Sequence, residues 1–249
     1  MSLLGREVRP RRILRGLASG YRIYVSPAEH LGYLLGTAEP HLQSIIRKYV
    51  RPGDTVYDVG ANIGYVTLSL AKGVGNAGRV IAFEPLPQNV KLLRENVAIN
   101  RLANVEIIER AASDRTGEAV IRMSDNLAMA SLVWHQRDSL AIEVAIRTVA
   151  IDELVQEGRL SAPKFVKLDV EGAEGVALLG MRNILIGAKP ILFVECSDVG
   201  RETTWRVLRN LGYRCQSAIT REEIRNFEQY RHSDFLWLPS GRCGTDQRS

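Results

Sequence analysis

Five short apolar runs, separated by segments with helical signals, constrain the fold of this chain more than any other feature. They are rich in Val, Ile, Leu and Phe and lack the strict polar alternation of a half-exposed strand, which is typical of strands buried on both faces. Strands that alternate with helices predict a doubly wound, mostly parallel α/β sheet. We expect the five strands at 55–59, 79–83, 105–109, 165–168 and 191–195.

The segments between these strands carry the helical signals. In the segment before the first strand, Pro40 suits the first position of a helix, and apolar residues recur at helical spacing from Leu42 to Tyr49. Ligands on sheets of this kind bind at the carboxyl ends of the strands. We expect helices at 40–50, 65–72, 87–100, 151–157, 173–186 and 202–211.

The alternation of strands and helices breaks once, after the third strand. Strand-like runs at 118–123 and 142–148 are separated by a polar loop, so we expect a small β insertion at about 117–148. Trp134 and His135 lie in this loop. They indicate either a lid over a bound acceptor or an ordinary hydrophobic cap on the sheet.

The formal net charge of +5 is concentrated at one end of the chain. Residues 1–22 hold six arginines and a single acid, Glu7, so the charges of residues 23–249 sum to zero. A basic end can bind nucleic acid or anionic lipid, or it can be a solvated flexible end, which is our expectation here. We therefore predict a basic tail at 1–22, one catalytic domain at 23–241 and a C-terminal tail at 242–249.

The remaining composition is that of a globular protein. Of the 249 residues 45% are hydrophobic and 24% charged, and no run approaches the roughly 20 apolar residues of a membrane helix. The three cysteines are odd in number and form no C-x-x-C pair, which argues against a disulfide framework or a zinc site. These features favour the reducing environment of the cytoplasm.

A glycine-rich loop follows the first strand, in the run from Asp58 to Gly64. Glycines let the backbone approach a ligand closely, and the helix that follows offers free N–H groups. The G-x-N-x-G spacing is neither the dinucleotide fingerprint nor a phosphate-binding P-loop. The acid before the glycines suits a cationic group, and Glu84, 20 residues after Gly64, suits the hydroxyls of a ribose.

An acidic cluster follows the fourth strand. Asp169, Glu171 and Glu174 fall within six residues and would repel one another in a closed site unless a cation is present or a pKa is raised. A carboxylate here could align an acceptor and take its proton. The alternatives are that Glu171 and Glu174 only favour a helix N-terminus, or that oxygen ligands hold Mg²⁺. Glu195 and His232, near the ends of later strands, are further candidates.

Three stretches together resemble one family. Asp58-Val59-Gly60-Ala61-Asn62-Ile63-Gly64-Tyr65-Val66-Thr67-Leu68, Phe83-Glu84-Pro85 and Val166-Lys167-Leu168-Asp169-Val170-Glu171-Gly172-Ala173-Glu174 are similar to motifs of class I S-adenosylmethionine-dependent methyltransferases, and more narrowly of the FkbM family. The resemblance covers about residues 30–240. It implies a seven-stranded sheet with one antiparallel strand near the end, which fits strand-like runs at 213–218 and 234–238.

The resemblance also implies site residues, with S-adenosylmethionine as cofactor. The methionine part would contact Glu39, Asp58, Gly60, Ala61, Asn62 and Gly64; the ribose, Glu84 and Pro85; the adenine, Ala112 and Ser113. Asp169 would lie where cofactor and acceptor meet, so it counts in both groups. The catalytic candidates are Asp169, Glu171 and His232, and no metal ligand is assigned.

The expected function is O-methylation of a small or medium molecule: a sugar, a polyketide or a lipid-linked saccharide. Two alternatives remain open. One is an RNA ribose methyltransferase that uses the basic residues 1–22, although the balanced charge of the remaining chain argues against a nucleic-acid partner. The other is a non-catalytic cofactor-binding protein. The oligomeric state is left open, with a homodimer as one option.

Overall fold

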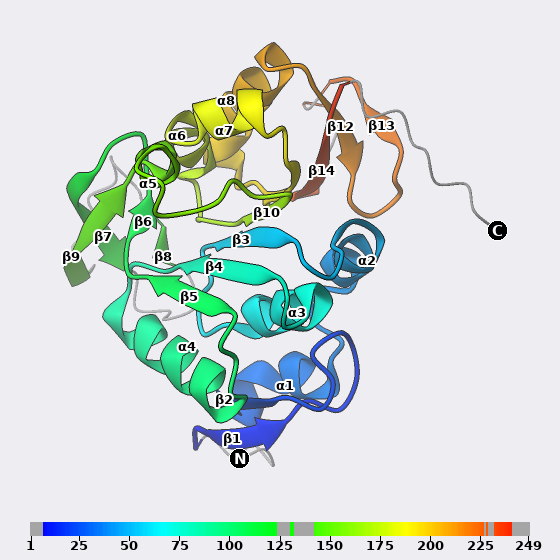
Figure 1. The fold of residues 1–249 in the computed structure, drawn as a ribbon, viewed down its shortest axis with the longest axis vertical. Coiled ribbons are helices and arrows are strands. Elements are labelled where there is room, and N and C mark those ends of the chain that lie inside the picture. Colours follow the sequence, from blue (N-terminus) through cyan, green and yellow to red (C-terminus); the bar gives the residue numbers. More distant parts are fainter. Residues whose placement is uncertain (1–6, 124–129, 132–141, 227, 229–231, 241–249) are drawn as a thin grey trace. The chain divides into compact units, whose positions relative to one another are not determined.

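The computed structural model describes residues 7–123, 130–131, 142–226, 228 and 232–240 (Figure 1). The chain divides into two compact units, Met1–Ala111 and Ala112–Ser249. Each unit contains strands and helices of the expected α/β class, and each is described by itself. None of the described helices is long and apolar enough to span a membrane.

The first unit is built on three parallel strands in the order β3, β4, β5. Apart from their first residues, β3 and β4 are buried, as their apolar composition predicts. The strands are β3 (Thr55–Val59), β4 (Arg79–Phe83) and β5 (Val105–Ile108). The helices are α1 (Pro27–Leu35), which the sequence did not indicate, α2 (Pro40–Tyr49), α3 (Tyr65–Val74) and α4 (Pro87–Ile99).

The basic N-terminal segment is folded. Strands β1 (Arg9–Arg12) and β2 (Arg22–Val25) form an antiparallel hairpin, and Ile13 and Ile23 are fully buried in one cluster with residues of α3. The free edge of β2 is covered by α4: Tyr24 N donates to Asn96 Oδ1 at 2.6 Å, and Arg22 N donates to Asn100 Oδ1 at 2.7 Å.

The expectation of a solvated flexible end is therefore wrong for residues 9–22. The domain boundary expected at residue 23 falls inside the hairpin. The segment folds because Ile13, Ala18 and Ile23 are completely buried in the core. The sequence does not reveal this, because these apolar residues are few and arginines occupy most of β1. Such a pattern contains no regular alternation that sequence reading can detect.

The second unit has two parallel strands followed by antiparallel ones, in the order β10, β11, β14, β12, β13. The mostly parallel α/β sheet with an antiparallel strand near its end is thus confirmed. The strands are β10 (Phe165–Leu168), β11 (Ile191–Glu195), β12 (Tyr213–Ser217), β13 (Glu223–Ile224) and β14 (Asp234–Pro239). The two-residue strand β13 is not among the seven strands expected from the sequence. Trp237, Phe165 and Phe193 are buried in the core of this unit.

The helices of the second unit differ from expectation in one place. Residues 173–186 do not form one helix but two, with a break at Gly180 and Met181. A Cβ atom at Gly180 would lie 1.8 Å from the Ser113 carbonyl oxygen, so the backbone passes this point too closely for any other residue. The helices are α5 (Ile151–Gln156), α6 (Glu174–Leu179), α7 (Arg182–Gly187) and α8 (Asp198–Asn210).

The expected β insertion is a hairpin in the second unit. Strand β7 (Gly117–Met123) pairs antiparallel with β9 (Ile142–Val149), and the short β8 (Ala130–Ser131) pairs with β7. The two-residue strand β6 (Ala111–Ala112) precedes them in the chain. Trp134 and His135, on which the lid hypothesis depends, lie outside the described residues.

The packing of the N-terminal hairpin predicts a specific loss of stability. Replacing Ile23 by Ala should lower the free energy of unfolding by about 2–5 kcal/mol, because it leaves a cavity in a cluster that includes Ile63 and Leu68. Chemical denaturation followed by circular dichroism measures this change. The exposed Val8, just before β1, provides the control: Val8→Ala should change stability by less than about 0.5 kcal/mol. Equal effects of the two changes would contradict the packing of the hairpin.

Candidate functional site

The glycine loop after β3 has a fixed conformation. Gly60, Asn62 and Gly64 have φ angles of 80°, 50° and 95°, in the left-handed region. The backbone N–H groups of Gly60 and Ala61 both donate to the Phe83 carbonyl at 3.0 Å, which ties the loop to the end of β4. These hydrogen bonds within the chain hold the loop in this shape, and α3 begins directly after it.

Glycine at position 64, besides allowing a left-handed φ, avoids a close contact with α4. A Cβ atom there would lie 2.5 Å from Leu93 Cδ1 of α4. The neighbouring Asn62 reaches its left-handed conformation with a local hydrogen bond, because its Oδ1 accepts from Ile63 N at 2.8 Å.

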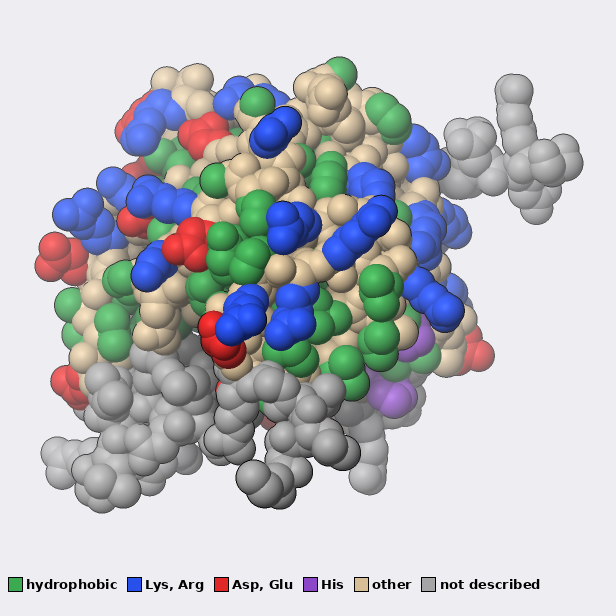
Figure 2. Space-filling model, turned by 90° about the horizontal axis from the view of Figure 1, so that it is seen from below, with side chains coloured by type: hydrophobic (Ala, Val, Ile, Leu, Met, Phe, Trp, Pro, Cys, Tyr) green, Lys and Arg blue, Asp and Glu red, His purple; other side chains and the backbone are tan. Residues whose placement is uncertain are grey.

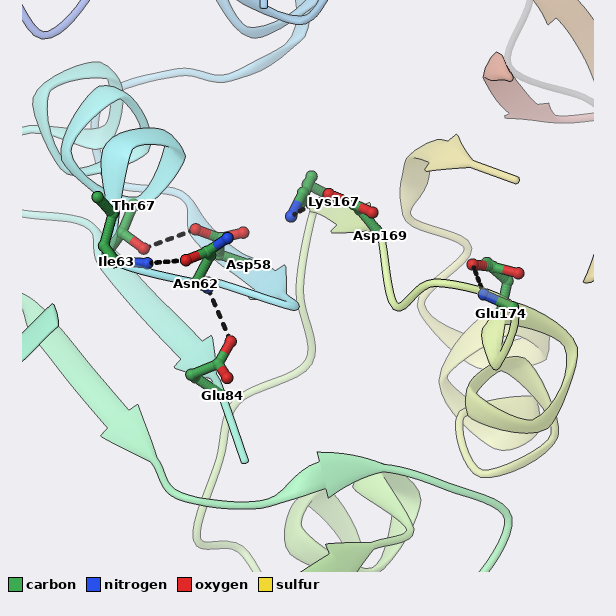
Figure 3. Close-up of polar contacts among 9 residues, drawn as sticks. Asp58, Asn62, Ile63, Thr67, Glu84, Lys167, Asp169 and Glu174 are labelled. Carbon is green, nitrogen blue, oxygen red and sulfur yellow. Dashed lines mark hydrogen bonds and ion pairs between the residues drawn. The ribbon is translucent and has the colours of Figure 1, made fainter. Parts of the chain in front are cut away.

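The carboxylate of Asp58 is fully buried at the end of β3. Its Oδ2 accepts a hydrogen bond from Thr67 Oγ1 at 2.6 Å, and Thr67 is itself fully buried on α3 (Figure 3). A buried carboxylate is stable only when hydrogen bonds or charges compensate it, so Thr67 helps to hold this acid in place. Sequence reasoning placed Thr67 in the family motif but gave it no role.

Glu84, directly after β4, joins the glycine loop to the start of α4, with one carboxylate oxygen on each. Oε2 accepts from Asn62 N at 2.8 Å (Figure 3), while Oε1 accepts from Leu86 N at 3.0 Å and from Asn89 Nδ2 at 3.2 Å. The side chain is 4% exposed. Glu84 thus has a structural part in this site in addition to the ribose contact that the resemblance implies. Pro85 follows it, half-buried, just before α4.

Glu39 lies in the same unit, at the start of α2. Its φ of 52° is unusual for a residue with a side chain. Burial, followed by the charges of Tyr33 and Glu39, raises the pKa of Tyr65 to about 12. Glu39 thus interacts electrostatically with Tyr65, the first residue of α3 after the glycine loop, and Tyr65 stacks on Tyr33 with ring centroids 4.4 Å apart.

Gln43 on α2 is a site residue that sequence reasoning missed. It is 4% exposed, and its Oε1 accepts from Leu17 N at 2.8 Å. Its Nε2 donates to the Ala38 carbonyl at 2.7 Å and to Tyr65 Oη at 3.2 Å. One buried amide therefore joins the N-terminal hairpin loop, the segment before α2 and the start of α3. A polar residue among the apolar ones of a helix was the signal available in the sequence.

In the second unit, Asp169 follows β10 beside a buried cation. Lys167 Nζ lies 3.3 Å from Asp169 Oδ2, and the two side chains are 5% and 29% exposed, respectively (Figure 3). Sequence reasoning did not assign a role to Lys167, because a single lysine within a buried strand shows its partner only in the folded structure. The ion pair fixes the direction of the Asp169 carboxylate, which, like that of Glu171, remains partly accessible.

Glu171 and Glu174 stand in different environments. Glu171 has a φ of 49°, and burial, with the charge of Asp169, raises its pKa against the opposing effect of Lys167. Glu174 is fully buried. Burial raises its pKa as well, opposed by hydrogen bonds from backbone N–H groups that include Gly172 N, at 2.8 Å from Oε1. The charge of Asp169 contributes to both raised pKa values, as expected when acids lie close together.

The buried position of Glu174 depends on close packing between α6 and α8. A Cβ atom at Gly200 would lie 1.9 Å from Glu174 Oε2, and one at Gly175 would lie 2.4 Å from Thr203 Cγ2. A larger residue at Gly175 would collide with Thr203, and one at Gly200 would displace the Glu174 carboxylate from its present position. Glu174 is therefore part of the packing between these helices, which is more than the helix N-terminus effect considered from the sequence.

The other predicted residues lie elsewhere in the second unit. Ala112 is 2% exposed, and Ser113 N donates to the Val149 carbonyl at 2.9 Å. His232 is exposed in the segment before β14, and Glu195 ends β11 half-buried. Among the residues that the structure describes, no group of three or more His, Cys, Asp and Glu side chains could hold a metal ion. The catalytic and cofactor assignments remain predictions.

Curated relatives match part of this chain. A hexuronic acid methyltransferase of Haloferax volcanii is 33% identical over 132 residues, which is 53% of this chain and 52% of the relative. Protein-L-isoaspartate O-methyltransferase 1 of Arabidopsis thaliana is 28% identical over 148 residues, 56% of this chain and 60% of the relative. The 31-O-demethyl-FK506 methyltransferase FkbM of Streptomyces tacrolimicus is 31% identical over 149 residues, 54% of this chain and 56% of the relative.

The chain thus spans little more than half the length of these relatives. A family model carries the assignment further, because the methyltransferase FkbM domain matches residues 58–215. That range is more than half of the chain and contains both the glycine loop and the acidic cluster. It confirms the resemblance read from the sequence motifs: this chain belongs to the FkbM methyltransferase family.

Proposed function

We propose that this chain is an S-adenosylmethionine-dependent O-methyltransferase that acts on a hydroxyl group of a saccharide or another small molecule. The observation that carries the proposal is the rigid glycine loop of the first unit, which lies between two buried carboxylates, Asp58 and Glu84. The family assignment and the chemistry of these groups support it.

The residues of the first unit fit the proposed cofactor chemically. When bound, S-adenosylmethionine supplies an electrophilic methyl group on a positively charged sulfur. Asp58 and Glu39 provide negative charge for its cationic groups, and Glu84 provides oxygen acceptors for ribose hydroxyls. The prearranged loop means that little ordering free energy is lost on binding.

The acceptor class is proposed from chemistry and from relatives. The name of the Haloferax volcanii relative specifies a hexuronic acid, and that of the Streptomyces tacrolimicus relative specifies an oxygen of FK506. Both names fit oxygen chemistry, as does the carboxylate of Asp169. A hydroxyl holds its proton tightly at neutral pH, so a fixed carboxylate that accepts this proton would lower the barrier.

We assign the roles in the second unit accordingly. Asp169 orients the acceptor hydroxyl and accepts its proton, and Lys167 holds the Asp169 carboxylate in one direction. Glu171 interacts electrostatically with Asp169 and is the second candidate for the group that accepts the proton. His232 is the alternative base. Mg²⁺ remains a minority alternative.

The proposed location is the cytoplasm. Cys196 and Cys215 are free and buried, and burial raises the pKa of the Cys196 thiol to about 12. Such thiols are poorly reactive and suit a reducing compartment.

The cofactor assignment predicts the effect of changing Asp58. Asp58→Asn should weaken S-adenosylmethionine binding by roughly 10- to 100-fold, the usual contribution of a hydrogen bond to a charged group. Isothermal titration calorimetry with S-adenosylmethionine and S-adenosylhomocysteine measures this. Asp54→Asn, in the turn before β3, is the matched control and should leave affinity unchanged. Absence of binding by the unchanged protein would refute the enzyme proposal.

The acceptor assignment predicts a different pattern for Asp169. Asp169→Asn should retain cofactor affinity but lower turnover by roughly 100- to 10,000-fold, as expected when a group that transfers protons is removed. Transfer of a labelled methyl group to a panel of uronic acids, oligosaccharides and macrolide alcohols provides the measurement. Asp198→Asn, at a highly exposed acid of α8, is the control. Unchanged turnover in Asp169→Asn would exclude this residue from the mechanism.

A further inference from the structure

We propose that the N-terminal hairpin and the end of α1 form a surface that docks on anionic phospholipid bilayers. This surface combines exposed arginines with exposed leucines, and all of it belongs to the first unit. We call it the hairpin patch, and its residues are Arg12, Leu14, Arg15, Arg22, Leu31 and Leu35. The proposal goes beyond methyl transfer and does not depend on it.

The charge of the hairpin patch is concentrated and unbalanced. Residues 8–25 contain five arginines and no acid. Arg12 and Arg22 face each other directly across the two strands, and both are exposed. Like charges in this position destabilise a strand pair. In the described part of the chain, neither of them has a carboxylate within ion-pair distance, whereas Arg9 is paired with Glu7.

The apolar part of the hairpin patch comes from two segments that meet. Leu14, Leu31 and Leu35 are 61%, 42% and 40% exposed. Leu31 and Leu35 lie one turn apart on α1, and Leu14 N donates to the Leu34 carbonyl at 2.9 Å, which places Leu14 beside the end of that helix. Figure 2 views the molecule from the side on which β1, β2 and α1 lie in Figure 1, and shows Lys and Arg side chains with hydrophobic ones between them.

The combination of residues favours a bilayer over nucleic acid. Arginines are attracted to anionic headgroups, and exposed leucines gain free energy only where hydrocarbon is available. Single-stranded nucleic acid is usually held by exposed aromatic rings between basic residues. Here Tyr21 and Tyr24 are half-buried, and the Tyr21 ring is covered by Lys72 Nζ at 5.3 Å from its centroid.

The hairpin patch is also held on a rigid base. Ile13 and Ile23 anchor the hairpin in the core, and Asn96 and Asn100 bind the free edge of β2. The backbone of Arg15 lies against Gly36, where a Cβ atom would be 1.9 Å from the Arg15 carbonyl oxygen. A surface fixed in this way loses little conformational freedom on docking.

Sedimentation with lipid vesicles tests the proposal on the full chain. The protein should bind vesicles that contain phosphatidylglycerol, bind phosphatidylcholine vesicles weakly or not at all, and be released by salt. Arg12→Gln/Arg22→Gln should weaken binding by about 25-fold, at about fivefold for each arginine near an anionic surface. Leu14→Ser should weaken it by roughly tenfold or more.

Matched changes in the second unit provide the controls. Arg206→Gln/Arg214→Gln and Val199→Ser alter residues that are also exposed, in α8 and β12, and should leave vesicle binding unchanged. Circular dichroism should show that Arg12→Gln/Arg22→Gln is as stable as the unchanged protein, since the change removes a repulsive pair.

Three outcomes would overturn the proposal. The first is no binding of the unchanged protein to phosphatidylglycerol vesicles. The second is an equal loss of vesicle binding in the control variants, which would indicate nonspecific attraction. The third is salt-sensitive binding of RNA that needs Arg12 and Arg22 but is indifferent to Leu14→Ser, without vesicle binding; this would assign the surface to nucleic acid.

Discussion

The hydrogen bonds of the Glu84 carboxylate support the candidate site of the first unit, at the ends of β3 and β4. One oxygen holds the loop through Asn62 N, and the other holds the start of α4 through Leu86 N and Asn89 Nδ2. A charge buried to 4% exposure would be costly without such donors. The same carboxylate therefore fixes the backbone geometry and supplies the polar chemistry of the site, so changes that disturb one would disturb the other.

The sequence predicted the parts of the fold that depend on local pattern. Apolar runs located β3, β4, β10 and β11, because strands buried on both faces must be apolar along their length. Spacing located the glycine loop for a similar reason: left-handed backbone at Gly60 and Gly64 leaves few alternatives to glycine. The start of α8 could also have been found, since Ser197 is an N-cap whose Oγ accepts from Gly200 N.

Contacts between distant segments could not be predicted in this way. Thr67 and Gln43 make their contacts with residues 9 and 22 positions away, on other elements, and no periodicity in the sequence marks these pairs. The break between α6 and α7 follows from the approach of Ser113 to Gly180, a contact across 67 positions of chain. The sequence shows that position 180 is a glycine, but it does not show which residue packs against that glycine in the fold.

The net charge of the chain is informative only when the positions of the charged residues in the structure are known. The +5 of the chain is accounted for by residues 1–22, and those of them that the structure describes from residue 9 onward belong to a packed hairpin. Ile13 and Ile23 are each fully buried there, while Arg12 and Arg22 face each other at the surface. Two like charges placed opposite each other at the surface do not stabilise the hairpin. Features that do not contribute to the stability of the fold are expected at functional surfaces. The position of the charge is therefore informative about a binding surface, whereas its total says little about the substrate.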